Sequence, residues 1–351
     1  MPFSCTNFET GDELMTENIR DIFLEREKKI LSKYAFLTAN TKGRDHPYKP
    51  CTIRTEFQRD RDKITHSESF RRLMNKTQVF LAPVGDHYRT RLTHTLEVTQ
   101  IARIIARALS LNEDLCEAAA LGHDIGHTPF GHAGEDAMRM CYDPNFAHYA
   151  QSLRVVEKLE NGGKGLNLTW EVRDAIFNHT GKMMASTLEG VIVKYADRIA
   201  YINHDIDDAC RAGILTLDDI PANLRKVLGE THSQRINTLV HSVITASDGK
   251  PSITMTEEIG EAMNELRDFL FENVYYNPIA KAQENKAKEL VIRLFEYYVK
   301  YPEKMPELYY RNTQTEPVER CVCDYVSGMT DRYAIELYKD LFVPEVWRGK
   351  C

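Results

Sequence analysis

Histidines are concentrated in one short stretch of this sequence. The chain has 12 histidines in 351 residues, and six of them lie between residues 87 and 148. They are His87, His94, His123, His127, His132 and His148. Imidazole is the usual neutral nitrogen ligand of metals in proteins and the usual proton carrier near neutral pH. The concentration therefore indicates a site with metal-binding or acid–base chemistry.

Four side chains from three separated segments have the types needed for one metal site. His123 and Asp124 are adjacent at the predicted end of a helix. Neighbours within a regular helix point about 100° apart, but at a helix end both can face one ion. His94 reaches the same point if its helix packs antiparallel to the next, and Asp197 comes from a later helix. We predict one divalent ion held by these four residues.

Two imidazoles and two carboxylates form a ligand set of mixed character. Such a set suits Mn, Fe, Co, Ni, Zn or Mg and leaves coordination positions open for water or substrate. A second Mg²⁺ carried in by substrate phosphates is compatible with the same chemistry. The set does not select among these ions, and a His-Asp dipeptide alone is more often structural than metal-binding. The prediction therefore depends on the complete set of four.

A second group of titratable residues lies around the predicted ligands. His127, His132 and Glu135 lie on or beside a glycine-rich bend that starts at Asp124, and His148 begins the next predicted helix. A carboxylate that is hydrogen-bonded to a histidine fixes its tautomer and raises its basicity, as general acid–base catalysis requires. We predict catalytic roles for these residues, although each one singly could be structural.

Basic side chains accompany the same motifs in the sequence. They are Arg71, Arg72, Lys76, Arg89, Arg91 and Arg198. The planar guanidinium group matches the oxygens of a phosphate group. Arg91 is the best placed, because it lies one helical turn before His94 on the same face. Together with a metal site, these residues predict a phosphate ester or anhydride as substrate.

The spacing of apolar residues predicts helices throughout, and hence an all-α fold. Leu92, Leu96, Ile101, Ile105 and Leu109 repeat at helical spacing within residues 90–111. Further helices are predicted at 113–122, 149–161, 169–180, 188–211, 219–229, 232–246, 256–275, 281–300, 315–327 and 331–340. The predicted organisation is an N-terminal arm (1–50), a helical core (51–212) and a helical C-terminal region packed on the core (213–351).

Composition narrows the class of protein. The formal net charge is −7, so the chain lacks the overall positive charge typical of nucleic-acid-binding proteins, and nucleic-acid binding is not indicated. A local basic groove is still allowed. The first 13 residues lack the pattern of a signal peptide, and no apolar run is long enough to cross a membrane. Eight cysteines are scattered without a CxxC pair. We expect a cytoplasmic protein with free thiols and no membrane contact.

The motifs resemble those of the HD-domain phosphohydrolases, with His94, His123-Asp124 and Asp197 in the order H, HD, D. More narrowly, they resemble the deoxynucleoside triphosphate triphosphohydrolases, also called dGTPases. The resemblance covers roughly residues 50 to 210 and rests on the segments THSESFRRL, KTQVF, RLTHTLEV, HDIGHTPFGH and ADRIAY, which begin at residues 65, 76, 91, 123 and 196. The combination is highly specific, whereas the HD dipeptide alone is not.

The resemblance implies an all-α fold and hydrolysis of a deoxynucleoside triphosphate (dNTP) to a deoxynucleoside and inorganic tripolyphosphate. It implies the same four metal ligands, and it matches His127, His132 and His148 to active-site histidines of the family. Glu135 stands where some relatives have Asp. The implied substrate-binding residues are Arg91 and Arg198 for the phosphates, Tyr201 for the sugar-phosphate, and Gln78 and Asp205 for the ribose 3′-hydroxyl; Arg198 is Lys in some relatives.

In the implied reaction, the metal and arginines neutralise the triphosphate, a metal-polarised water attacks the α-phosphorus, and a histidine protonates the departing 5′-oxygen. We expect His132 or His148 to donate that proton. The resemblance also implies a homo-oligomer, a tetramer or hexamer, and in some members activation by a second nucleotide.

Two alternatives stay open. One is another HD-type reaction, as in a nucleotidase, a pyrophosphohydrolase or a cyclic-nucleotide phosphodiesterase, which would release different products. The other is a nonenzymatic nucleotide sensor or nucleic-acid adaptor. The sequence does not reveal the preferred base, because base recognition depends on loops and backbone contacts.

Overall fold

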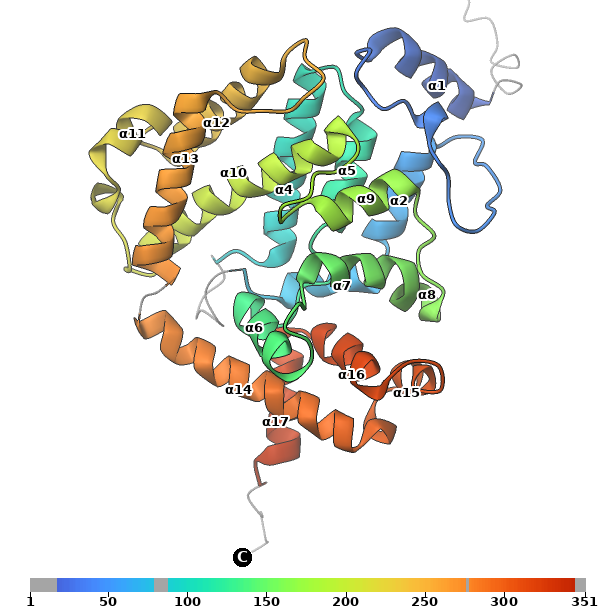
Figure 1. The fold of residues 1–351 in the computed structure, drawn as a ribbon, viewed down its shortest axis with the longest axis vertical. Coiled ribbons are helices and arrows are strands. Elements are labelled where there is room, and N and C mark those ends of the chain that lie inside the picture. Colours follow the sequence, from blue (N-terminus) through green and yellow to red (C-terminus); the bar gives the residue numbers. More distant parts are fainter. Residues whose placement is uncertain (1–17, 79–87, 276–277, 345–351) are drawn as a thin grey trace, which may run out of the picture.

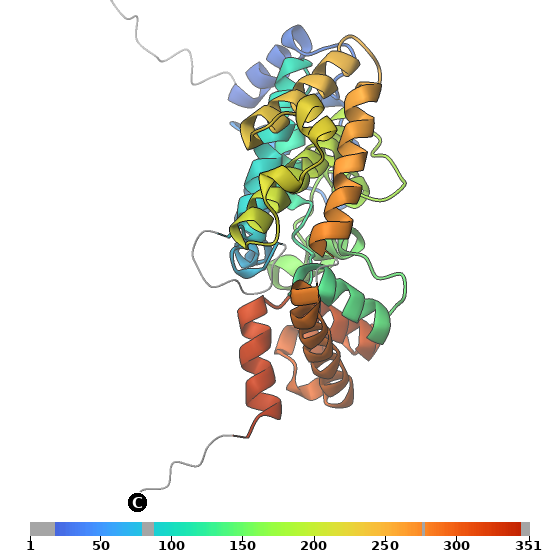
Figure 2. The ribbon, with the colours of Figure 1, turned by 90° about the vertical axis from the view of Figure 1, so that its left-hand side faces the viewer.

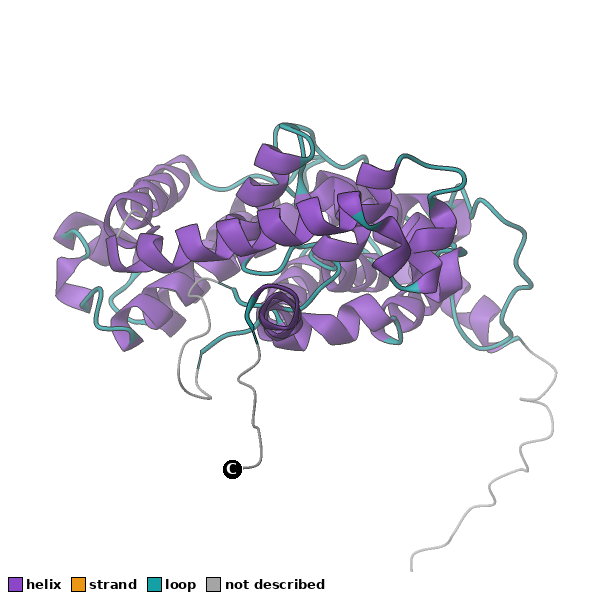
Figure 3. Cartoon of the chain, turned by 90° about the horizontal axis from the view of Figure 1, so that it is seen from below, coloured by secondary structure: helices purple, strands orange, loops and turns teal. Residues whose placement is uncertain are grey.

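Helices make up the regular secondary structure of the described part of the chain (Figure 3). The computed structural model describes residues 18–78, 88–275 and 278–344. His87 lies outside these residues. The first ten helices are α1 (Ile19–Ile30), α2 (Glu56–Thr65), α3 (Glu68–Arg72), α4 (Arg91–Ala108), α5 (Glu113–Gly122), α6 (Gly131–Cys141), α7 (His148–Arg154), α8 (Glu160–Gly163), α9 (Trp170–Asn178) and α10 (Leu188–Arg211).

The remaining helices complete the C-terminal part. They are α11 (Ala222–Leu228), α12 (His232–Ser247), α13 (Glu257–Leu270), α14 (Pro278–Lys300), α15 (Glu307–Asn312), α16 (Val318–Ser327) and α17 (Asp331–Phe342). The prediction of an all-α fold is confirmed, since the described residues contain no strand and only one isolated bridge, between Thr77 and Thr90. None of the helices described here has the length and apolar character needed to cross a membrane.

Two of the predicted helices are interrupted in the structure. The predicted helix 149–161 is divided into α7, a π-helical turn (Val155–Leu159) and the short α8, inside which Asn161 and Gly162 have left-handed backbones. The predicted helix 256–275 is α13 followed by a π-helical turn (Phe271–Tyr275). The structure also contains α1, α2 and α3, which the helical spacing did not predict.

Helices α4, α5 and α10 form the centre of the main core (Figure 1). His94 lies on α4 and Asp197 on α10, and His123 and Asp124 directly follow the end of α5. Thr90 caps α4 by accepting a hydrogen bond from Thr93 N, and Asn112 caps α5 by accepting one from Leu115 N. The buried apolar faces of these helices pack against α11, α12 and α13. The two ligand-bearing helices α4 and α10 are therefore fixed over much of their length.

A second core lies at the other end of the molecule. Buried residues of α6, among them Ala137 and Met138, pack there with Val291 of α14 and Val326 of α16. Figure 2 shows α14 and α17 grouped at this end, away from α11 to α13. The C-terminal region thus contacts the rest of the chain in two ways. Helices α11 to α13 extend the first core, and residues of α14, α16 and α17 pack with α6 in the second core.

The bend between α5 and α6 is pressed against the start of α7. Gly126 N donates to Ser152 Oγ at 2.9 Å, and Ser152 Oγ donates to His123 O at 2.8 Å. A Cβ atom on Gly126 would lie 2.1 Å from Ser152 N and 2.4 Å from Gln151 C. Real Cβ atoms do not approach backbone this closely, so the contact requires glycine.

Replacing Gly126 with alanine should destabilise the fold by about 1–3 kcal/mol or more, because the bend and α7 must separate. Urea unfolding measures this change. Gly260→Ala is the matched control, since a Cβ there meets nothing within 4 Å and alanine favours a helix by up to about 1 kcal/mol. Equal stability of Gly126→Ala and the wild type would contradict the tight contact.

Candidate active site

The four predicted metal ligands meet at one point between α4, α5 and α10. His94 Nε2 lies 3.1 Å from Asp197 Oδ1. His123 Nε2 lies 3.9 Å from Asp197 Oδ1 and 3.9 Å from Asp124 Oδ1. His94, His123 and Asp124 are buried, while the Asp197 side chain is 18% exposed. The structure therefore brings together side chains that are up to 103 residues apart in sequence, from His94 to Asp197.

The donor atoms suit a divalent ion. His123 Nδ1 lies 2.6 Å from Ala120 O, and a carbonyl only accepts, so Nδ1 carries the proton and Nε2 has the free lone pair. That Nε2 atom is buried and has no hydrogen-bond partner among the described residues. Ligands about 2.0–2.2 Å from a common ion stand about 3–4 Å apart, which is the spacing found here. The residues present fit a bound metal.

Arg91 fixes the second oxygen of Asp124. Its Nη1 donates to Asp124 Oδ2 at 2.6 Å, and both side chains are almost fully buried. Burial alone would raise the pKa of Asp124, but Arg91 and the surrounding histidines outweigh it and hold the pKa well below its usual value. Asp124 is therefore a carboxylate at neutral pH, as a metal ligand must be.

His148 is held between a carboxylate and a second imidazole. Glu135 Oε1 accepts from His148 N at 3.0 Å and lies 3.3 Å from His148 Nδ1. His148 Nε2 lies 3.3 Å from His179 Nε2, and His179 Nδ1 donates to Ile176 O at 2.7 Å. His179 Nε2 is thus an acceptor, so His148 can carry protons on both nitrogens.

The electrostatics of this trio favour a charged His148. Burial lowers the pKa of an imidazole, but the hydrogen bond and charge of Glu135 outweigh it and raise the pKa of His148. Burial also opposes ionisation of Glu135, yet His148 and Arg139 hold its pKa at about 2. By contrast, burial and Arg91 lower the pKa of His127 and of His132. His148 is therefore the most readily protonated of the three predicted histidines.

These groups open into a cavity of about 490 Å³. Most of the predicted site residues line it: Gln78, Arg91, His94, Asp124, His127, His132, His148, Asp197, Tyr201 and Asp205. His123 and Glu135 are not among the lining residues, but His123 Nε2 lies 3.9 Å from Asp197 Oδ1 and Glu135 Oε1 lies 3.3 Å from His148 Nδ1. The lining residues that were not predicted are Phe130, Ala133, Asp136, His179, Thr180, Phe271 and Glu284. Of these, His179 had a visible signal in the sequence, as another histidine beside a glycine turn.

Three predicted substrate-binding groups keep unused polar atoms in this region. Gln78 Oε1, Arg91 Nε and Asp205 Oδ1 are buried and have no hydrogen-bond partner in the described part of the chain. Burial and the charge of Asp208 raise the pKa of Asp205 well above its usual value, which favours the protonated form that can donate as well as accept. Buried polar atoms without partners are costly, and a polar ligand would satisfy them.

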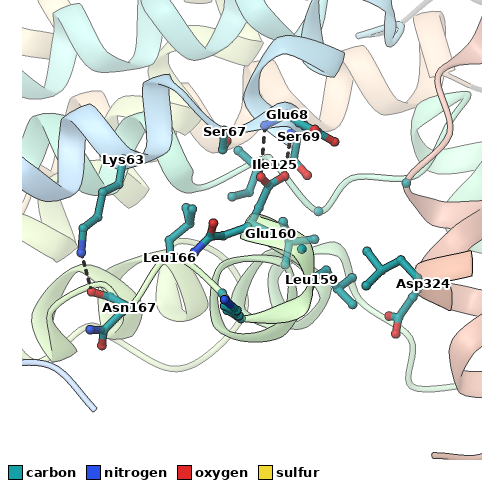
Figure 4. A pocket seen from close by; sticks show the side chains of 18 of the residues that line it. Lys63, Ser67, Glu68, Ser69, Ile125, Leu159, Glu160, Leu166, Asn167 and Asp324 are labelled. Carbon is teal, nitrogen blue, oxygen red and sulfur yellow. Dashed lines mark hydrogen bonds between the residues drawn. The ribbon is translucent and has the colours of Figure 1, made fainter. Parts of the chain in front are cut away.

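The other basic residues near the motifs do not line this cavity. Arg198 donates to Asn264 Oδ1 at 2.7 Å, and its phosphate-binding role stays a prediction. Arg89 is paired with Glu97, Asp207 and Asp208. Arg71 and Arg72 line a separate cavity of about 890 Å³ beside α3. There Glu160 accepts from Glu68 N and Ser69 N, and Lys63 donates to Asn167 O (Figure 4).

The C-terminal region braces the loop that carries His127. Lys76 Nζ lies 2.5 Å from His127 O and 3.0 Å from Ser327 O. Asp331 accepts from Phe130 N at 2.9 Å and from Thr77 N at 3.0 Å. Phe130 has a left-handed backbone (φ 62°), which such contacts hold in place. The shape of the cavity therefore depends on α16 and α17.

Lys76 should make stability depend on pH. Burial, with the charge of Arg72, lowers its pKa from 10.5 to about 7. Between these values the unfolded chain binds more protons at this position, so the free energy of unfolding rises with pH. We expect the wild type to gain stability relative to Lys76→Met between about pH 7 and about pH 9.

Urea unfolding of both proteins at the two pH values measures this gain. Lys304→Met, at an exposed position, is the control and should not change the pH dependence. A constant difference between the wild type and Lys76→Met across this range would show that Lys76 keeps its proton in the folded protein.

Two protein-family models match parts of this chain. The HD domain family model matches residues 91–202, which contain all four predicted ligands, and the phosphohydrolase-associated domain model matches residues 253–340. HD domains are metal-dependent phosphohydrolases. The second match covers most of α13 to α17, the helices that include the brace described above.

Similar proteins extend over nearly the whole chain. A deoxyguanosinetriphosphate triphosphohydrolase-like protein of Caldanaerobacter subterraneus subsp. tengcongensis is 55% identical, over 94% of this chain and 97% of its own length. Proteins of the same description are 48% identical in Desulfatibacillum aliphaticivorans and 46% identical in Clostridium perfringens, each over 93% of this chain and 98% of the relative. The chain therefore belongs to the HD-domain phosphohydrolases, in the deoxyguanosinetriphosphate triphosphohydrolase-like family.

Proposed function

We propose that this protein hydrolyses deoxynucleoside triphosphates to a deoxynucleoside and inorganic tripolyphosphate. The observation that supports this best is the convergence of two imidazoles, two carboxylates and Arg91 on one cavity, with His148 on its wall. The names of the relatives add support, because they point to a deoxyguanosine triphosphate. His94, His123, Asp124 and Asp197 would hold one divalent ion, which when bound supplies Lewis-acid activation of water and phosphate oxygens.

Arg91 binds the triphosphate in this proposal. Its Nη1 is taken by Asp124, while its Nε has no partner among the described residues. A guanidinium group with free N–H donors in a buried site binds phosphate oxygens strongly. The role of Arg91 is to neutralise the charge of the phosphates and to orient them.

Gln78 and Asp205 bind the sugar in this proposal. Both line the cavity and both have a buried oxygen without a partner. A ribose 3′-hydroxyl has one proton to donate and lone pairs to accept with, so it can satisfy both side chains. Tyr201, four residues before Asp205 on α10, lies on the same side of the helix and lines the cavity beside them.

His148 supplies the proton for the leaving group. A water oxygen forms a bond to the α-phosphorus, and the bond between that phosphorus and the 5′-oxygen breaks. The electron pair stays on the 5′-oxygen, which takes a proton from His148 and becomes the 5′-hydroxyl of the deoxynucleoside. The attacking water loses a proton to solvent, and His148 regains one from solvent. Glu135 stabilises the protonated imidazole and fixes its orientation.

A metal-resolved activity screen with product analysis tests the proposal. Metal-free protein is loaded separately with Mn, Mg, Co, Ni, Fe or Zn and assayed with the four dNTPs and GTP, singly and in pairs. We expect deoxynucleoside and tripolyphosphate as the products. Stepwise release of orthophosphate or pyrophosphate would indicate another HD-type reaction, and inactivity with every metal and nucleotide pair would favour a nucleotide sensor. Stimulation by a second nucleotide would reveal an activator site.

A further inference from the structure

A histidine that the proposed reaction does not use lies directly behind the metal ligand His94. His204 is fully buried on α10. Its Nδ1 lies 3.5 Å from His94 Nδ1, and the two rings meet edge to face. On its other side, His204 Nε2 contacts Glu97 Oε2. On α4, the proposed ligand His94 and Glu97 are one turn apart. On α10, the proposed ligand Asp197 and His204 are seven residues apart. Each helix therefore contributes one proposed ligand and one further residue.

A metal ion bound to His94 would determine which ring nitrogen carries the proton in His94 and in His204. If His94 Nε2 gives its lone pair to an ion, the proton of a neutral His94 must lie on Nδ1. Among the described residues, the hydrogen-bond partner of His94 Nδ1 is His204 Nδ1, which must then be an acceptor. A neutral His204 with a free Nδ1 carries its own proton on Nε2, an atom that contacts Glu97 Oε2 but has no hydrogen-bond partner among the described residues.

Glu97 is itself held in place. Arg89 Nε lies 3.3 Å from Glu97 Oε1, and the other nitrogens of Arg89 contact Asp208 at 3.1 Å and Asp207 at 3.3 Å. Because three carboxylates occupy the guanidinium group of Arg89, we assign it no role in binding substrate phosphates. A metal-bound histidine is commonly oriented by a hydrogen bond from its second nitrogen to a carboxylate or carbonyl. His123 has such a carbonyl directly, from Ala120.

We propose that His204 and Glu97 are positioning residues for the metal site. In the metal-bound protein, His94 Nδ1 would donate to His204 Nδ1 and His204 Nε2 would donate to Glu97, which orients His94 and selects its metal-binding tautomer. No ion pair or hydrogen bond joins Glu97 to His94 in the described part of the chain, so His204 would connect the carboxylate to the ligand. This inference rests on the proposed function in that it requires a metal ion at His94.

Metal titration of the purified full-length protein tests the inference without reference to activity. Metal-free wild type, His204→Phe, Glu97→Leu and Glu97→Gln are titrated with Mn²⁺, with free Mn²⁺ measured by electron paramagnetic resonance. Co²⁺ absorption spectra report the geometry of the bound ion. His241→Phe, at an exposed position on α12, is the matched control. Thermal melting of each apoprotein establishes that it is folded.

We expect His204→Phe and Glu97→Leu to bind Mn²⁺ about 10–100-fold more weakly than the wild type, with altered Co²⁺ spectra. Glu97→Gln should lie between, because its amide oxygen still accepts from His204 Nε2. That graded rescue would not arise from a purely structural role. If His204→Phe does not fold, Glu97→Leu decides the matter, since the Glu97 side chain is 35% exposed.

Two results would overturn the inference, and they are distinguishable. If folded Glu97→Leu and His204→Phe bind Mn²⁺ as the wild type does, His204 and Glu97 do not orient His94, while the proposed function stands. If the wild type itself binds neither Mn²⁺ nor Co²⁺, the metal site and the proposed function fail together with the inference.

Discussion

Asp197→Asn should lower the turnover of deoxynucleoside triphosphates by about a thousandfold or more. The amide replaces a carboxylate whose Oδ1 lies 3.1 Å from His94 Nε2 and 3.9 Å from His123 Nε2. It removes a negative charge and a strong ligand while keeping the shape of the side chain. A bound metal commonly contributes several kcal/mol of transition-state stabilisation, and about 1.4 kcal/mol corresponds to a tenfold change in rate.

Metal content and activity must be measured on the same samples. We expect the wild type to retain one Mn²⁺ per chain after gel filtration and Asp197→Asn to retain almost none. Asp218→Asn is the control, because Asp218 is exposed and contacts only Arg225 among the charged residues described. Treatment of the wild type with a chelator should reproduce the loss, and added Mn²⁺ should reverse it. Full activity of metal-free Asp197→Asn would exclude the proposed ligand set.

The second large effect is expected at His148. Replacing His148 with glutamine should lower turnover between about a hundredfold and ten-thousandfold, the usual contribution of a general acid. Metal content should not change, because His148 is not one of the proposed ligands. Glu135→Gln should have a smaller effect, since it weakens the support of the imidazole but leaves the proton donor in place.

The nature of the leaving group separates proton donation from other roles of His148. In 4-nitrophenyl triphosphate, nitrophenolate takes the place of the deoxynucleoside and departs without a proton. His148→Gln should therefore be much less impaired on this compound than on a deoxynucleoside triphosphate. His132→Gln is the comparison, because burial lowers the pKa of His132 and so reduces the fraction of it that is protonated at a given pH. Equal impairment of His148→Gln on both compounds would show that His148 does not protonate the leaving group.

Helical spacing predicted most of the architecture, and its failures have local causes. The helices that bury one apolar face, such as α4 and α10, could be recognised because their apolar residues repeat with the helical period. The helix predicted at 149–161 is broken by a π-helical turn and by left-handed Asn161 and Gly162. Short helices such as α3 have too few residues to show a period.

For the four proposed metal ligands, the residue types could be read from the sequence, whereas their positions in space depend on the fold. Types and order of the residues were sufficient to single out His94, His123, Asp124 and Asp197. Whether their atoms meet depends on how α4, α5 and α10 pack, and the structure has separations of 3.1–3.9 Å between ligand atoms. Sequence spacing cannot give such distances, because they arise from side-chain packing between helices far apart in the chain.

The remaining roles were decided by burial and contact. The sequence alone left His132 and His148 equal as proton donors, and it grouped Lys76 and Arg89 with the phosphate-binding residues. In the folded chain Glu135 contacts His148, Lys76 is hydrogen-bonded to two backbone carbonyls, and Arg89 holds Glu97. By itself the sequence determined the helical fold, the family pattern and the chemical types at the site. Only the tertiary structure decided which groups are paired, buried or free, because pKa values and hydrogen bonds depend on neighbours that the chain brings together only when it folds.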